Sequence, residues 1–320
     1  MSHSPRRTDV PKLIRAHPVR RPGRLVSAVV AAVLAAMAVN ALVTNPNFRW
    51  DLVWLYARDV TVIKGVGWTL LLTAASMAIA VVLALALAIM RRSDNPVMRA
   101  VAWFYIWFFR GTPIYTQLTF WGLLAVLYPR LSLGVPFGPE FVVFSTNDVF
   151  NAAWAAIIGL ALNEAAYLAE IFRSGLASVD AGQGEAARAL GMKESTILRR
   201  IVIPQAMRVI VPPTGNETIS MLKTTSLVLA VPFTLDLTFV TNSVGNRLFL
   251  PIPLLMVAAI WYLLITSVLM VGQHYLERYY GRGFAGAGPA PRGGKGLGKK
   301  QQAILAAGTT KDDPFLENTP

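Results

Sequence analysis

Residues Gly65 to Met90 read GVGWTLLLTAASMAIAVVLALALAIM, a run of 26 residues without a charged side chain. A helix rises about 1.5 Å per residue, so roughly 20 apolar residues cross the hydrocarbon core of a bilayer. The run exceeds that length. We therefore interpret it as a membrane-spanning helix and not as a core element of a soluble domain.

The rest of the chain repeats this character on both sides of the run. Hydrophobic residues make up 54% of the sequence and charged residues only 15%, whereas soluble domains average about 25% charged. Five further candidate spans are Leu25–Val43, Pro113–Tyr128, Ala152–Phe172, Thr214–Val231 and Leu250–Gly272. The first follows a basic stretch, as a signal peptide does, but its apolar part is too long and lacks a small-residue cleavage site. The sequence predicts an all-α polytopic membrane protein with six spans.

The placement of positive charge predicts which side of the membrane each end occupies. Of the 30 Lys and Arg residues, 23 fall in the four segments that are internal if the N-terminus is cytoplasmic, and five fall in the outer loops. The internal segments are 1–24, 91–99, 173–211 and 273–320. Lys and Arg near span ends remain on the cytoplasmic side. We expect a multi-pass protein of the cell membrane with both termini in the cytoplasm.

Residue types also limit the chemistry. The chain has no cysteine, and His3, His17 and His274 are far apart in the sequence, so no ligand cluster for a metal is expected. The glycine-rich tail contains GGKGLGKK at 293–300, which resembles a phosphate-binding loop. It has Lys300 where that loop needs a hydroxyl, and neither a strand nor a helix flanks it. We expect no nucleotide site, no bound cofactor and no enzymatic activity in this chain.

The long internal segment 173–211 holds signals for two short helices. Asp180 is expected to cap the first, Gly191 to end it in the left-handed conformation, and Ser195 to cap a second helix that Pro204 closes. The pair would form a rigid projection at the membrane surface. Upstream, Thr112 and Pro113 fit a helix start after an aromatic stretch, which places Arg110 at the interface with its charge turned to the headgroups.

The internal segment carries a motif with fixed spacing. Glu185-Ala186-Ala187 is followed after three residues by Gly191 and after nine more by Ile201-Val-Ile-Pro204. This resembles the E-A-A-x3-G-x9-I-x-L-P loop of the permease subunits of ABC importers. Flanking motifs narrow the resemblance to the polar amino acid, histidine/glutamine-type permeases over roughly 65–280; they include Arg110-Gly-Thr-Pro113, Arg173-Ser-Gly175 and Pro204-Gln-Ala206.

The resemblance implies a specific organisation. The expected fold is the type I ABC importer transmembrane fold, with a five-helix core inside 65–280 and an additional N-terminal helix at 25–43. A basic arm, 1–24, and a disordered tail, 283–320, lie outside the resemblance. The implied partners are a cytoplasmic ATP-binding subunit that carries ATP and Mg, an extracytoplasmic binding protein, a second permease that is identical or homologous, and an amino acid substrate. The coupling loop would act through Glu185, Ala186, Ala187, Arg188, Gly191, Ile201 and Pro204.

Ionisable groups at bilayer depth are costly and therefore functional candidates. Glu164 and Lys223 lie at nearly equal predicted depth with opposite charge, so they either pair or face the substrate pathway. Asn163, Asn216 and Thr225 add hydrogen-bonding groups that could line a pathway or join helices. Glu217 with Thr214 fits a helix cap, and Glu170 lies one turn from Arg173.

Two other classes of function compete with the importer permease. A secondary transporter or channel would move an amino acid without ATP and is favoured by inverted repeats and broken helices, neither of which stands out here. A membrane enzyme would need a catalytic cluster, and the sequence shows none of the expected kinds. Co-purification with an ATPase separates these classes, because only the importer permease requires one.

Overall fold

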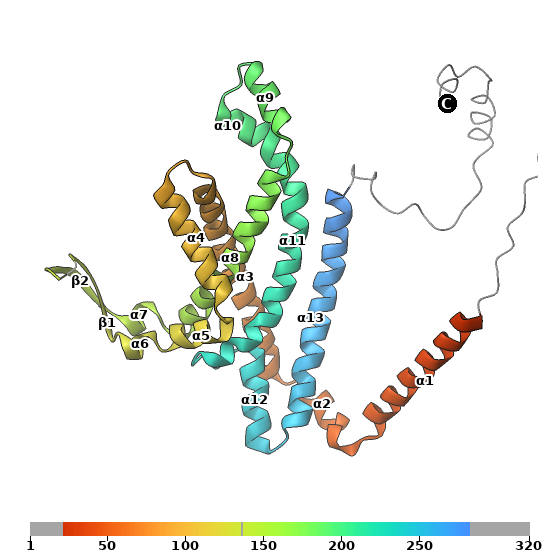
Figure 1. The fold of residues 1–320 in the computed structure, drawn as a ribbon. Coiled ribbons are helices and arrows are strands. Elements are labelled where there is room, and N and C mark those ends of the chain that lie inside the picture. The colour runs from red at the N-terminus through yellow and green to blue at the C-terminus, as the bar shows by residue number, and fades with distance from the viewer. Residues whose placement is uncertain (1–21, 136, 282–320) are drawn as a thin grey trace, which may run out of the picture. The chain divides into compact units, whose positions relative to one another are not determined.

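A computed structural model describes residues 22–135 and 137–281. Its elements follow the chain as a series of helices with one short hairpin (Figure 1). They are α1 (Pro22–Thr44), η1 (Pro46–Phe48), α2 (Trp50–Ala57), α3 (Val60–Arg92), α4 (Pro96–Gly111), α5 (Ile114–Gly122), α6 (Leu124–Leu127), β1 (Arg130–Gly134), β2 (Glu140–Ser145), α7 (Thr146–Val149), α8 (Ala152–Ala177), α9 (Ala181–Ala189), α10 (Glu194–Ile197), η2 (Leu198–Val202), α11 (Ile203–Thr224), η3 (Thr225–Ala230), α12 (Leu237–Leu248) and α13 (Pro251–Tyr280). The N-terminal arm and the C-terminal tail, including 293–300, lie outside the described residues.

Four helices are long and apolar enough to cross a membrane. They are α1, α3, α8 and α13, which correspond to four of the six predicted spans. The predicted span Pro113–Tyr128 is instead two short helices, α5 and α6, that meet at Leu123. The predicted span Thr214–Val231 is the second half of α11 followed by the 3-10 turn η3. The helical membrane fold is confirmed, and the count of six crossings stays a prediction.

The chain divides into two compact units. Among the described residues, the first contains 22–80, 107–164 and 220–267, and the second contains 81–106, 165–219 and 268–281. Leucines from several helices fill the core of the first unit, where Leu72, Leu118, Leu160, Leu222 and Leu254 are at most 1% exposed. Small residues carry the packing of the second unit. A Cβ on Gly175 would clash with Ile210, so α8 and α11 approach closely there.

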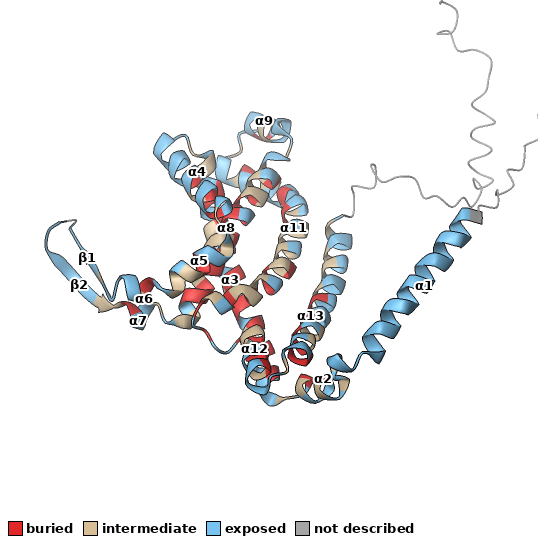
Figure 2. Cartoon of the chain, turned by 60° about the horizontal axis from the view of Figure 1, so that its bottom comes forward, coloured by how far each residue is buried: buried red, intermediate tan, exposed pale blue. Residues whose placement is uncertain are grey.

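Helix α1 differs from the other long helices because its described side chains are all exposed (Figure 2). A helix that is apolar over its whole length after Arg24 and has no buried face is not stable in water, whereas in a bilayer its surface contacts lipid. The exposure of α1 therefore fits the predicted retained membrane helix.

A β-hairpin is the one departure from helix and turn among the described residues. Strand β1 pairs antiparallel with β2, with Arg130 opposite Ser145 and Leu133 opposite Val142, and the register shifts next to Gly134. The all-helical prediction missed it. Its signal is the β-branched and aromatic run Phe141-Val-Val-Phe144, which favours a strand.

Candidate functional site

The loop between α8 and α11 is built on a capped helix. The Asp180 carboxylate accepts a hydrogen bond of 2.7 Å from the Gly182 backbone N–H, which satisfies one free donor at the start of α9. On this helix the Ala187 side chain is buried at 3% exposure, whereas Glu185 and Ala186 are exposed. The predicted cap and short helix are confirmed, and the motif presents two of its three residues outward.

The turn after α9 depends on a glycine. Gly191 has φ of +75°, a left-handed conformation that side chains with a Cβ adopt at a cost. Around it the Gly191 N–H donates to the Arg188 carbonyl at 2.8 Å, and the Met192 N–H donates to the Ala187 carbonyl at 3.1 Å. These bonds satisfy carbonyl groups that the end of α9 would leave free. The predicted glycine corner is confirmed.

An ion pair joins the two sides of this corner. The Arg188 guanidinium at the end of α9 binds the Glu194 carboxylate at the start of α10 through two nitrogens. This hydrogen bond lowers the pKa of the Glu194 carboxyl below its ordinary value and raises the pKa of Arg188. Both side chains are exposed, so the pair orients the corner more than it stabilises it.

The second short helix differs from the prediction in both of its ends. Helix α10 begins at Glu194 after Lys193, so Ser195 lies inside it and does not cap it. Pro204 does not close the helix either, because it is the second residue of α11 and the helical backbone continues past it. The π-helical turn η2, which contains half-buried Ile201, connects α10 to α11.

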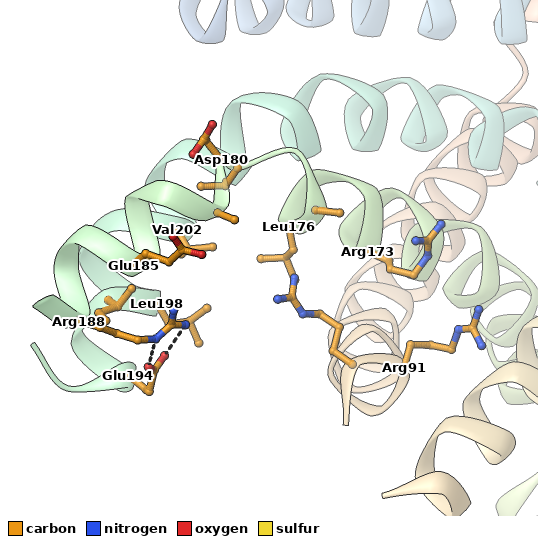
Figure 3. A pocket seen from close by; sticks show the side chains of 15 residues that line it. Arg91, Arg173, Leu176, Asp180, Glu185, Arg188, Glu194, Leu198 and Val202 are labelled. Atoms are coloured by element: carbon orange, nitrogen blue, oxygen red, sulfur yellow. Dashed lines mark hydrogen bonds and ion pairs between the residues drawn. The ribbon is translucent and has the colours of Figure 1, made fainter. Parts of the chain in front are cut away.

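A cavity of about 700 Å³ lies beside this loop in the second unit (Figure 3). Arg91 and Arg173 lie on one side of it, and Glu185, Arg188 and Glu194 lie on the other. The predicted local pair of Glu170 and Arg173 is present, at 2.8 Å between carboxylate and guanidinium. Outside the cavity, Ser195, Thr196, Arg199 and Arg200 line a separate hollow of about 420 Å³.

In the first unit, a polar cluster holds the junction of α4 and α5. The Gln117 amide donates to the Phe109 carbonyl at 3.0 Å and to the Thr112 hydroxyl at 2.6 Å. Asn163 on α8 donates to the same Phe109 carbonyl at 2.8 Å and to the Gln117 side-chain oxygen at 3.1 Å. The amide of Asn163 thus joins helices in this structure. Thr112 does not cap α5 as predicted, because its hydroxyl donates to the Phe108 carbonyl one turn earlier.

Sequence reasoning overlooked Gln117, which is 6% exposed inside an apolar run. A buried amide needs partners, and the two free carbonyls left by the Gly111–Pro113 break provide them. The signal was present as a glutamine next to a helix-breaking proline. Arg110 lies in the last turn of α4 with an exposed side chain, as a residue at an interface requires.

A second polar cluster is formed around the hydroxyl group of Tyr262 on α13. The Tyr262 hydroxyl lies 2.9 Å from the Thr238 hydroxyl and 3.4 Å from that of Thr225. Thr225 is fully buried and also donates to the Leu222 carbonyl at 2.6 Å. The predicted pathway residue Thr225 therefore lies in the protein interior with partners of its own.

The two charged pathway candidates differ in exposure. Glu164 on α8 is 7% exposed, whereas Lys223 in the last turn of α11 is exposed, as is Asn216. An exposed ammonium on a helix of this unit can meet a ligand or a second subunit. The predicted cap of Thr214 with Glu217 is wrong, because both lie inside α11 and the Thr214 hydroxyl donates to the Ile210 carbonyl.

Within the described residues, no three His, Cys, Asp or Glu side chains cluster as a metal site would require. What the residues do provide is a set of long apolar helices, a projecting loop with a glycine corner, and polar groups at helix junctions. Together these features describe a polytopic membrane protein with a projecting helical loop.

The family is shown by comparison with known proteins. Residues 80–281 match the family described as the binding-protein-dependent transport system inner membrane component. The chain belongs to this family, so it is the membrane component of a transport system that works with a binding protein.

Named relatives share most of their length with this chain. An arginine transport system permease protein of Corynebacterium glutamicum is 50% identical over 277 residues, which is 86% of each chain. A histidine/lysine/arginine/ornithine transport system permease protein of Escherichia coli is 36% identical over 208 residues, 64% of this chain and 83% of the relative. A crystal structure of an amino acid ABC transporter with histidines matches 68% of this chain and 94% of that chain, with 33% identity and a TM-score of 0.57. The fold is that of ABC importer permeases.

Proposed function

We propose that this chain is a permease subunit of an ATP-driven importer of basic amino acids, with arginine as the first substrate to test. One observation carries the coupling part of this proposal. The E-A-A motif folds as a capped helix followed by a left-handed glycine corner, with Glu185 exposed beside it. A rigid projection of this kind suits a groove on a separate ATPase, because it can transmit rigid-body movement.

The coupling loop in this proposal consists of Glu185, Ala186, Ala187, Arg188, Gly191, Ile201 and Pro204. A cytoplasmic ATP-binding subunit docks there and holds ATP and Mg, and this chain binds no cofactor. A binding protein delivers the substrate from outside, and a second permease, identical or homologous, completes the pathway. Both termini lie in the cytoplasm of a cell-membrane protein, which the excess of Lys and Arg in the internal segments supports.

The substrate class rests on charge as well as on the relatives. Arginine at neutral pH carries an ammonium, a guanidinium and a carboxylate. Glu164 supplies a buried carboxylate and Lys223 an exposed ammonium in one unit of this chain. In our proposal these two groups meet the cationic and anionic ends of the substrate.

Reconstituted transport tests this proposal directly. The chain is co-expressed with a candidate ATPase and a candidate binding protein of the same organism, purified and placed in liposomes. We expect uptake of labelled arginine that requires ATP and the binding protein, and weaker or no uptake of glutamate. Arginine uptake driven by an ion gradient without ATP would favour a secondary transporter and contradict the proposal.

A further inference from the structure

The cavity beside the coupling loop has two unlike walls (Figure 3). Arg91 and Arg92, the last residues of α3, form one wall together with Arg173 of α8. Residues of α9 and α10 form the other. All of them belong to the second unit, so the cavity is a feature of one compact part of the chain.

The charges of the loop wall already have protein partners. Arg188 binds Glu194, and the nearby Glu185 carboxylate also acts on the Arg188 charge. Asp180 accepts the cap hydrogen bond from Gly182. On the opposite wall, Arg173 is held by Glu170. Among its described residues, the loop wall thus carries three carboxylates against one guanidinium, and its only cation, Arg188, is already paired, so the cations available to an incoming ligand are on the opposite wall.

Arg91 and Arg92 differ from these residues. Neither has an ion-pair partner among residues 22–135 and 137–281. The Nε–H group of Arg91 is buried, and the described part of the chain provides no acceptor for it. Nε itself is out of reach of a ligand, but the guanidinium has further N–H donors that no ion pair among the described residues engages and that a ligand in the cavity can meet. For a guanidinium, the fitting partner is an anion.

The position of the cavity selects the anion. Helix α3 is apolar from Gly65 to Met90 and ends with these two arginines, so they lie where a membrane span reaches the headgroups. Leu176, Leu198 and Val202 also line the cavity and offer an apolar surface next to the charges. Basic pockets at this level suit phosphate-bearing headgroups.

We propose that this cavity binds the phosphate of an anionic phospholipid headgroup through Arg91 and Arg92. The bound phosphate pairs with the guanidinium groups of Arg91 and Arg92, and the lipid fills the space between the end of α3 and the coupling loop. The inference rests on α3 crossing the membrane and does not require the loop to dock an ATPase.

Lipid binding to the purified transporter, with its ATPase subunits bound, tests the proposal. Native mass spectrometry titrates phosphatidylglycerol and, separately, phosphatidylcholine against wild type and the double variant Arg91→Gln with Arg92→Gln. Each basic residue near an anionic surface contributes about 1 kcal/mol, so losing two should weaken phosphatidylglycerol binding about 30-fold. Phosphatidylcholine, which has no net charge, should bind weakly to both proteins.

A matched control keeps the charge change and moves it away from the cavity. Arg199→Gln with Arg200→Gln removes the same number of positive charges from two exposed arginines, and it should bind phosphatidylglycerol as wild type does. Arg91→Lys with Arg92→Lys should retain most of the binding, which shows that loss in the glutamine variant is not misfolding. Equal loss in the 199/200 variant, or none in the 91/92 glutamine variant, would overturn the proposal. Displacement of the lipid by millimolar inorganic phosphate would overturn the lipid assignment and identify a free-phosphate site.

Discussion

Replacing Gly191 tests whether the corner after α9 couples ATP hydrolysis to transport. A Cβ built at this position meets no atom within 4 Å, so a larger side chain has room. The cost comes from the backbone, because φ is +75° and the left-handed region costs a non-glycine residue about 1 to 2 kcal/mol. A β-branched residue tolerates this region least. For Gly191→Val we therefore expect a penalty of about 2 kcal/mol, which disfavours the native corner roughly 30-fold.

The assay measures coupling and folding separately. Substrate-stimulated ATP hydrolysis and arginine uptake by the reconstituted complex should fall strongly in Gly191→Val, while membrane insertion and the yield of purified chain persist. Gly191→Asn is the matched control, because asparagine adopts the left-handed conformation readily and should retain most activity. Full stimulated hydrolysis in the valine variant, or equal loss in the asparagine variant, would refute the reasoning from backbone conformation.

Three further predictions concern charge. Since Glu164 is buried and Lys223 is exposed, Glu164→Gln and Lys223→Met should each reduce arginine uptake, and the double variant should transport no better than either single variant. If both single variants lost thermal stability and the double variant regained it, the two residues would instead form a buried pair, whose breaking costs about 3 to 5 kcal/mol. Asp236 caps α12, and burial raises the pKa of its carboxyl to about 6. The folded state therefore holds this proton more tightly than the unfolded chain does. As the pH rises from 4 to 7, the free energy of unfolding should fall by on the order of 2 to 3 kcal/mol. Chemical denaturation should show a flatter pH dependence for Asp236→Asn, and an unchanged one would contradict the assignment. Reporters fused at Met1 and at Pro320 should both be cytoplasmic, and ends on opposite sides would mean an odd number of spans.

The coupling loop was the most predictable part of the chain. Its cap at Asp180 and its corner at Gly191 depend on interactions within a few residues, and such local rules can be read from sequence. The ion pair of Arg188 with Glu194 was not predicted. It follows from the corner, which brings two residues six positions apart face to face.

Local rules were wrong where tertiary packing determines the helix. Thr214 and Glu217 have the spacing of a cap, yet they lie inside α11, which continues through Pro212 and Pro213. Gln273 on α13 donates to the Pro212 carbonyl at 2.7 Å, so a residue 61 positions away contacts the backbone of α11 at its prolines. No pattern in 203–224 indicates this contact.

The error at Pro204 matters for how the loop can act. A second short helix closed by Pro204 would have made the loop a separate lever joined to the membrane part by a flexible link. In the structure, α10, the π turn η2 and α11 follow one another without a break from Glu194 to Thr224. Because the helical backbone continues through Pro204, a displacement imposed on α10 is passed on to the start of α11, and the π turn and Pro204 are the places where this run can bend. The same helix carries Asn216 and Lys223, so the proposed docking site and part of the proposed pathway are connected through a single continuous run of helical backbone.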